Sequence, residues 1–144
     1  MKRAVWLLGI LAVLAFHSVD ARACTCDLPL LNRTPKQQVN QARKHARAVF
    51  SGTVLSIDEA TYSERVTFKI EGFWKGTLSK EVVVVTSRGG GDCGYRFEVG
   101  ESYLVYAYGV NEASLGTNIC QRTAPLSADA GDLKLLGKPK RQVP

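Results

Sequence analysis

Residues 21–29 read Ala-Arg-Ala-Cys-Thr-Cys-Asp-Leu-Pro and place two cysteines one residue apart, directly after an apolar run. A bridge between Cys24 and Cys26 would close a strained ring, so we expect each to pair with a distant cysteine. The chain has two further cysteines, Cys93 and Cys120. Either remaining pairing ties this stretch to two distant segments of the chain.

The residues before Cys24 have the features of a secretory signal peptide. Lys2 and Arg3 give a positive start, residues 4–16 are apolar, and Ala21-Arg-Ala23 has the small-x-small pattern of a cleavage site. The apolar run is too short to cross a bilayer as a helix, which disfavours a retained anchor. We therefore predict a signal peptide over 1–23, no stable membrane anchor after cleavage, and a secreted or periplasmic protein.

Composition limits the classes of function. The chain has 144 residues and a formal charge of +6, which falls to +4 without residues 1–23. This mildly basic balance does not call for a nucleic-acid partner, and we expect none. His45 is the one histidine outside the predicted signal peptide, and no His-Cys or Ser-His-Asp set accompanies it. We expect a monomer that is not an enzyme and needs no cofactor.

An even number of cysteines in a small exported domain predicts disulfides. Four cysteines allow two bridges, which suit an oxidising compartment. The alternative is a four-cysteine zinc site. That site prefers Cys-x-x-Cys spacing and a reducing compartment, so we favour the two disulfides.

A first helix is expected to begin after Thr34. Thr34 can cap the helix, Pro35 suits its first position, and Gln37 completes a capping box. Val39, Ala42, Ala46 and Val49 then recur at helical spacing. Lys44, His45 and Arg47 fall on the other face, where we expect solvent; a binding patch is the alternative.

From Phe50 onward the pattern indicates strands. The expected strands cover 51–57, a segment around the alternating residues 66–70 that ends at a turn near Gly76, and 81–87, 103–108 and 115–121. The run Val82-Val-Val-Val85 is too apolar for a strand with one wet face. A second helix is predicted over 126–136, capped by Ser127 and stopped by Gly137. The prediction is a mainly β domain over 24–137, a five-stranded OB-type barrel with two flanking α-helices, followed by a frayed basic tail over 138–144.

The cysteine pattern resembles a known family. Cys24-Thr-Cys26 at a cleavage site, followed by Cys93-Gly-Tyr95 and by Cys120, is similar to the N-terminal, netrin-like domain of tissue inhibitors of metalloproteinases. The likeness covers residues 24 to about 136 and suggests a short, single-domain member of bacterial type. It implies two disulfides, Cys24–Cys93 and Cys26–Cys120.

The resemblance also implies a function, the inhibition of zinc metalloproteases. In that family the amine and carbonyl of the first cysteine chelate the zinc ion of the target protease, a role that falls here to Cys24. Thr25 would enter the specificity pocket. Cys26, Asp27 and the loop residues Gly90, Gly91 and Asp92 would share the contact. The alternative is an exported netrin-like binding module without inhibitory activity, in which the cysteines are purely structural.

Overall fold

The computed structural model describes Cys24, Cys26 and residues 32–88, 92–111, 113–128 and 130–140. The predicted signal peptide lies outside the described residues. The helices and strands are α2 (Pro35–His45), β1 (Ala48–Glu59), β2 (Ser63–Lys75), β3 (Glu81–Ser87), β4 (Ser102–Gly109), β5 (Leu115–Gly116), β6 (Ala124–Pro125) and α3 (Ala130–Leu136).

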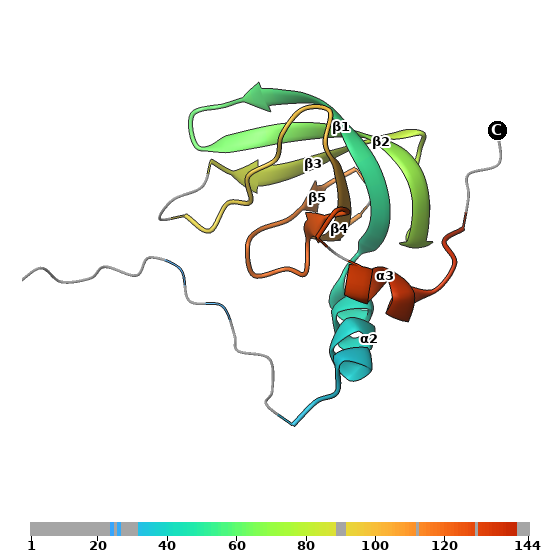
Figure 1. Ribbon diagram of the computed structural model, residues 1–144. Helices are drawn as coiled ribbons and strands as arrows, with labels where there is room; N and C mark the ends of the chain where they lie inside the picture. Colours follow the sequence, from blue (N-terminus) through green and yellow to red (C-terminus); the bar gives the residue numbers. More distant parts are fainter. Residues whose placement is uncertain are drawn as a thin grey trace, which may run out of the picture.

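Five of these strands close into a barrel (Figure 1). The order is β1-β2-β3-β5-β4, and β4 pairs back with β1. Every pairing between neighbours in the barrel is antiparallel except the short parallel contact between β3 and β5. The predicted fold class, a mainly β, five-stranded OB-type barrel with two helices and two disulfides, is therefore confirmed.

The first strand is the element that bends to close the barrel. Its first half pairs with β4, from Ala48 opposite Ala107 to Thr53 opposite Ser102, while its whole length pairs with β2. The β1–β2 register shifts at three places, and such irregularities increase the local bend of a strand. The strand is longer than the predicted 51–57 at both ends.

The barrel interior is filled by apolar side chains that alternate along the strands. Phe68 of β2 makes edge-to-face contacts with Phe50, Phe97 and Tyr103, with ring centroids 5.5, 5.2 and 6.5 Å away. Such aromatic pairs add stability beyond the burial of their area. In β3, Val82 and Val84 are buried and the alternate valines are half-buried, so neither face of the valine run is fully exposed, in line with the prediction.

The start of α2 follows the predicted cap. The Thr34 side chain accepts a hydrogen bond from the Gln37 amide, and Gln37 Oε1 accepts one from the Thr34 amide at 2.9 Å. This is the reciprocal capping box expected from the sequence. Pro35 occupies the first turn, where its missing N–H costs nothing.

The end of α2 differs from the prediction. Helical spacing extends to Val49, but the helix ends at His45 and Val49 belongs to β1. The Arg47 amide donates to the Ala107 carbonyl at 2.7 Å, which draws the chain into the barrel. Lys75 Nζ donates to two carbonyls of the last helical turn, at 2.9 and 2.8 Å. Pairing with β4 therefore overrides the helical pattern.

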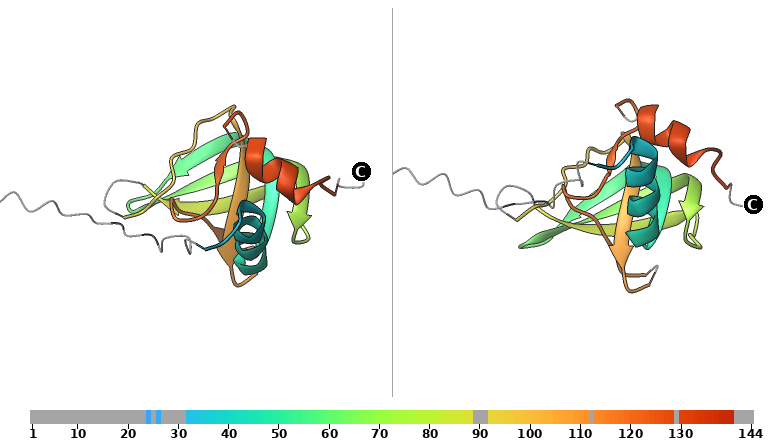
Figure 2. Two further views of the ribbon diagram at one scale, coloured as in Figure 1. Left: turned by 60° about the horizontal axis from the view of Figure 1, so that its bottom comes forward. Right: turned by 90° about the horizontal axis from the view of Figure 1, so that it is seen from below.

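Both helices cover the same side of the barrel (Figure 2). There a second apolar cluster forms outside the barrel interior, and Tyr106 and Leu104 of β4 contribute to it while Tyr103 and Val105 point inward. β4 is thus buried on both faces. The cluster consists of Val39, Ala46, Val49, Trp74, Leu104, Tyr106 and Leu136.

The second helix is shorter than predicted. It covers Ala130–Leu136, so it begins three residues after Ser127, the predicted cap. The preceding residues are held in the sheet instead, since Ala124 and Pro125 form β6 against β4 and the Leu126 amide donates to the Ser102 carbonyl at 2.9 Å. Gly137 adopts a φ of +74° and ends the helix, as predicted.

The residues after α3 are attached to the barrel. Lys140 and Phe73 exchange both backbone hydrogen bonds, at 2.8 and 3.0 Å, in an antiparallel bridge. The Trp74 indole N–H donates to the Gly137 carbonyl at 2.7 Å. The expectation of a frayed tail is therefore wrong for 138–140, because the end of β2 offers it partners.

Candidate functional site

The structure joins the cysteines in the pairs that the resemblance implied. Cys24 is bonded to Cys93 and Cys26 to Cys120, with Cα–Cα separations of 5.5 and 5.1 Å. These bridges exclude a four-cysteine zinc site, because none of the four is a free thiol. They also indicate an oxidising environment outside the cytoplasm.

The two receiving segments lie side by side. The Ile119 amide donates to the Cys93 carbonyl at 3.0 Å, next to Cys120. We call residues 92–95 and 117–123 the cysteine ledge. Cys24 and Cys26 are therefore fixed to adjacent points of one surface, so the residues on both sides of position 25 are held. Of the other predicted contact residues, Asp92 is described, whereas Thr25, Asp27, Gly90 and Gly91 lie outside the described residues.

The first segment of the cysteine ledge is held by a tight turn. Cys93 has a φ of +62°, a conformation that residues other than glycine seldom adopt. Asp92 Oδ1 accepts from the Gly94 amide at 3.4 Å, and the Tyr95 amide donates to Thr86 Oγ1 at 2.8 Å. The exposed Asp92 carboxylate thus supports the turn at Cys93. Burial, and then the neighbouring Tyr103, raise the pKa of Tyr95, so its ring remains neutral at the base of the turn.

The second segment replaces most of the predicted fifth strand. That strand was expected over 115–121, but β5 contains only Leu115 and Gly116. Beyond it, Thr117 Oγ1 donates to the Tyr106 carbonyl at 3.1 Å, and Thr123 Oγ1 accepts from the Tyr106 amide at 3.1 Å. The two buried hydroxyls are 2.9 Å apart. Because Thr117 uses its proton on the carbonyl, Thr123 donates to Thr117. Side chains thus satisfy backbone groups that a longer strand would have paired.

An ion pair between partly exposed Arg122 and buried Asp132 connects the cysteine ledge to the helices. Arg122 donates to both oxygens of Asp132, from Nε at 2.7 Å and from Nη2 at 2.5 Å, and the Tyr106 hydroxyl donates to Asp132 Oδ2 at 3.1 Å. Arg122 also reaches Gln38 Oε1 of α2 at 3.5 Å. Asp132 is only 5% exposed. The pair fixes the residue two positions after Cys120 to both helices.

Sequence reasoning did not identify these supporting residues. Asp132 lies in the first turn of α3, where the helix dipole favours a carboxylate, and nothing in the sequence pattern indicates its partner Arg122. Thr117 and Thr123 lie three residues before and three residues after Cys120. The sequence does not show that both contact β4, because it does not give the position of that strand. Ile119, which is 49% exposed on the cysteine ledge, is a further apolar side chain that the sequence analysis did not identify.

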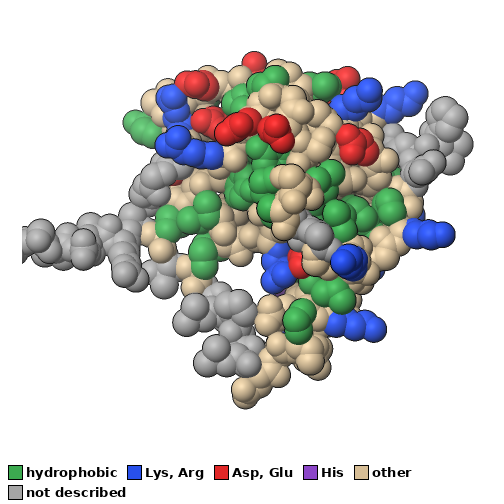
Figure 3. All heavy atoms as spheres, in the orientation of Figure 1, with side chains coloured by type: hydrophobic (Ala, Val, Ile, Leu, Met, Phe, Trp, Pro, Cys, Tyr) green, Lys and Arg blue, Asp and Glu red, His purple; other side chains and the backbone are tan. Residues whose placement is uncertain are grey.

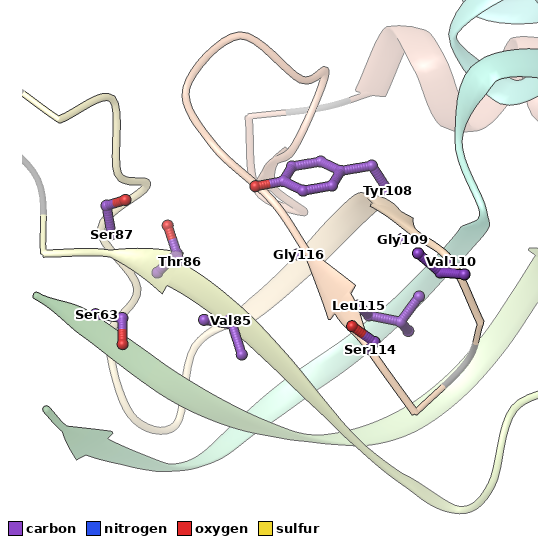
Figure 4. A pocket seen from close by; sticks show the side chains of 10 residues that line it. All are labelled: Ser63, Val85, Thr86, Ser87, Tyr108, Gly109, Val110, Ser114, Leu115 and Gly116. Carbon is purple, nitrogen blue, oxygen red and sulfur yellow. The ribbon is translucent and has the colours of Figure 1, made fainter.

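A groove of about 630 Å³ lies beside the cysteine ledge, between the end of β3 and the β4–β5 turn (Figure 4). Tyr108 extends across β5, and a Cβ at Gly116 would lie 2.8 Å from its ring, so a larger residue at this position would push the ring aside. None of the described residues that line the groove is charged, and its mainly apolar lining can accept an apolar group. Its lining residues are Ser63, Val85, Thr86, Ser87, Tyr108, Gly109, Val110, Ser114, Leu115 and Gly116.

The described residues contain no cluster of three or more His, Cys, Asp or Glu side chains able to hold a metal ion. Over the same part of the chain, no helix is both long and apolar enough to cross a membrane. The chain matches no known protein-family model and no curated protein. The cysteine pattern and the geometry around it are therefore the features that point to a function.

Proposed function

We propose that the protein is an exported inhibitor of zinc metalloproteases that acts through the amine and carbonyl of Cys24. The observation that carries the proposal is the pair of bridges to one surface, Cys24–Cys93 and Cys26–Cys120. A free chain end is normally too mobile to serve as a ligand, because ordering it costs entropy. Two bridges one residue apart remove most of that cost before any partner arrives.

The chemistry follows from cleavage before Cys24. The α-amine and the carbonyl oxygen of one residue can close a five-membered ring on a metal ion. A catalytic zinc ion keeps one position for the water that attacks the substrate. A chelating terminus would displace that water and so block the reaction. The zinc belongs to the target, and the inhibitor supplies only backbone atoms.

The neighbouring residues would determine which protease is bound. Thr25 is proposed to enter the specificity pocket, while Cys26, Asp27, Gly91 and Asp92 contact the rim. The hydrogen bond from the Gly94 amide to Asp92 keeps this carboxylate close to Cys93. Ile119 adds an exposed apolar side chain on the same surface. The proposed contact surface is therefore small and centred on the Cys24–Cys93 bridge.

The direct test compares two oxidised proteins against a panel of zinc metalloproteases. One begins at Cys24, and the matched control begins at Ala23 and is otherwise identical. We expect inhibition by the first and loss of inhibition by the second, because the extra residue converts the amine into an amide. Inhibition by the first should also weaken as the pH falls below about 8, where free α-amines take up a proton. Equal inhibition by both proteins would contradict the proposal.

The second candidate is an exported netrin-like binding module without inhibitory activity. The observation in its favour is that Cys93 and Cys120 sit in segments tied to the barrel by Thr86, Tyr106 and Asp132. Such attachment suits bridges that act only as staples. The same panel separates the two functions, since a module of this kind inhibits none of the proteases even when it begins at Cys24.

A further inference from the structure

The groove between β3 and the β4–β5 turn has an exposed aromatic ring along one side (Figure 4). Tyr108 crosses β5 against Gly116 and is still 44% exposed, so part of its ring is open to solvent. Val110, at the start of the β4–β5 turn, is 87% exposed. Aromatic and apolar side chains that stay this exposed beside a groove are available as contacts for a ligand. The groove therefore offers an apolar platform that the described fold does not cover.

Hydroxyl groups form another part of the lining. Ser63 at the start of β2 and Ser87 at the end of β3 pair with each other in the sheet, and both are half-buried. Ser114, in the β4–β5 turn, is exposed. Within the part of the chain that the structure describes, these three hydroxyls and that of Tyr108 have no hydrogen-bond partner in the protein. A hydroxyl both donates and accepts, so these groups can pair with a ligand that itself carries hydroxyls.

The charged residues next to the groove line a different part of the surface. Glu64 follows Ser63 and Arg88 follows Ser87, but both line a separate hollow that also includes Glu59, the ion-pair partner of Arg88. Figure 3 shows apolar side chains at the surface over the middle of the barrel, with charged side chains of both signs mostly around them. An ion placed against an uncharged lining loses solvation without gaining an opposite charge. The groove, whose described lining is uncharged, therefore favours a neutral ligand.

We propose that this groove binds a neutral oligosaccharide, with one pyranose ring against Tyr108 and its hydroxyls paired with those of Ser63 and Ser87. A sugar ring has a face of C–H groups and a rim of hydroxyls. The face matches the exposed tyrosine ring, and the rim matches the serines. A purely apolar ligand would cover the half-buried serine hydroxyls without giving them partners, which costs free energy. Because the groove is open, a chain of sugars can extend beyond the ring that it holds.

The position of the groove agrees with the way OB-type barrels bind ligands. Such barrels bind oligosaccharides through the loop between the first two strands and the loop between the last two. Here Ser63 directly follows the first of these loops, while Val110 and Ser114 belong to the second. Likeness of fold does not define a ligand, so the proposal depends on the exposed ring and the unpaired hydroxyls. The described lining shares no residue with the cysteine ledge, and the inference does not depend on what the cysteine ledge binds.

The test is an NMR titration of the oxidised, isotope-labelled chain over 24–144. The probes are uncharged hexasaccharides of glucose, in α- and in β-linkage, and of N-acetylglucosamine. Tyr108→Ala removes the aromatic platform. The matched control is Tyr62→Ala, which removes an 83% exposed tyrosine of the β1–β2 turn that does not line the groove. A further variant, Ser63→Ala with Ser87→Ala, removes two hydroxyls and keeps the apolar lining. The same spectra show whether each variant is folded.

We expect at least one hexasaccharide to shift the amide signals of groove residues such as Gly116 and Ser87. Tyr108→Ala should weaken this binding about tenfold and the double serine variant about fivefold, whereas Tyr62→Ala should leave it unchanged. Absence of shifts with all three sugars at millimolar concentration would overturn the proposal, and so would an equal loss in the Tyr62 variant. Unchanged or tighter binding by the double serine variant would also overturn it, because the groove would then be a purely apolar site.

Discussion

The cysteine ledge and the helix-covered side of the barrel are held in different ways. The cysteine ledge depends on two disulfides, on hydroxyl groups that pair with backbone, and on one turn with positive φ at Cys93. The helices depend on apolar burial around Trp74 and Tyr106, with caps at their ends. Irregular segments bury little apolar surface, so their order must come from covalent and polar links. The Arg122–Asp132 pair connects the two regions.

The largest expected effect comes from removing a bridge of the cysteine ledge. Changing Cys26 and Cys120 together to Ser should lower the free energy of unfolding by about 4–5 kcal/mol, because the bridge closes a long loop in the unfolded chain. Urea unfolding of the oxidised protein measures the change. Removal of Cys24 and Cys93 is the matched control and should cost a similar amount. A loss below about 1 kcal/mol would show that the cysteine ledge is held without its bridges.

The helix-covered side should be most sensitive at Trp74. This side chain is 6% exposed, and its indole N–H donates to Gly137. Changing Trp74 to Ala should cost about 4 kcal/mol through the cavity it creates. Changing it to Phe keeps most of the packing and should cost about 1–2 kcal/mol, mainly through the lost hydrogen bond. If urea unfolding shows the same loss of stability for the Ala and Phe variants, apolar packing is not what stabilises the helix-covered side of the barrel.

The link between the two regions can be isolated by a double-mutant cycle. Changing Asp132 to Asn should cost about 2 kcal/mol, since it removes the charge while Arg122, about a third exposed, can still reach water. Changing Arg122 to Met gives the second single variant. The two effects should be clearly non-additive, with a coupling of at least about 1 kcal/mol. Additive losses would mean that the pair does not couple the cysteine ledge to α3.

The smallest effect is expected at the cap of α2. Changing Thr34 to Ala removes the acceptor for the Gln37 amide and should cost about 1 kcal/mol. The Thr34 to Ser variant keeps the hydroxyl and should be nearly neutral. Thermal unfolding of both proteins measures the difference. A loss of similar size in the Ser variant would indicate that the methyl group, and not the cap, is what matters.

Local signals in the sequence predicted much of the fold. The cap at Thr34 and the stop at Gly137 are local, and both were predicted correctly. The errors arise where a distant strand captures the chain. Val49 follows the helical pattern of α2 but pairs with β2 and β4, and Leu126 is held by Ser102 of β4 before α3 can begin.

The candidate site was predicted less completely for the same reason. The cysteine pairing followed from the family resemblance, and the structure has it. The residues that support the cysteine ledge were not predicted, because their partners are remote. Arg122 and Asp132 are ten positions apart in the sequence. The hydroxyls of Thr117 and Thr123 acquire their role only from the backbone of Tyr106, to which both are hydrogen-bonded. A sequence pattern shows what a residue type can do, but not which buried atom it meets.

We propose that processing leaves Cys24 as a free chain end held by two bridges. The intact mass of the exported protein, before and after reduction and with labelling of free amines, tests it directly. We predict a chain that begins at Cys24, is four hydrogens lighter than its reduced form, and carries an unblocked α-amine at its first residue. A chain that begins elsewhere, retains free thiols or has a blocked first amine would contradict this proposal.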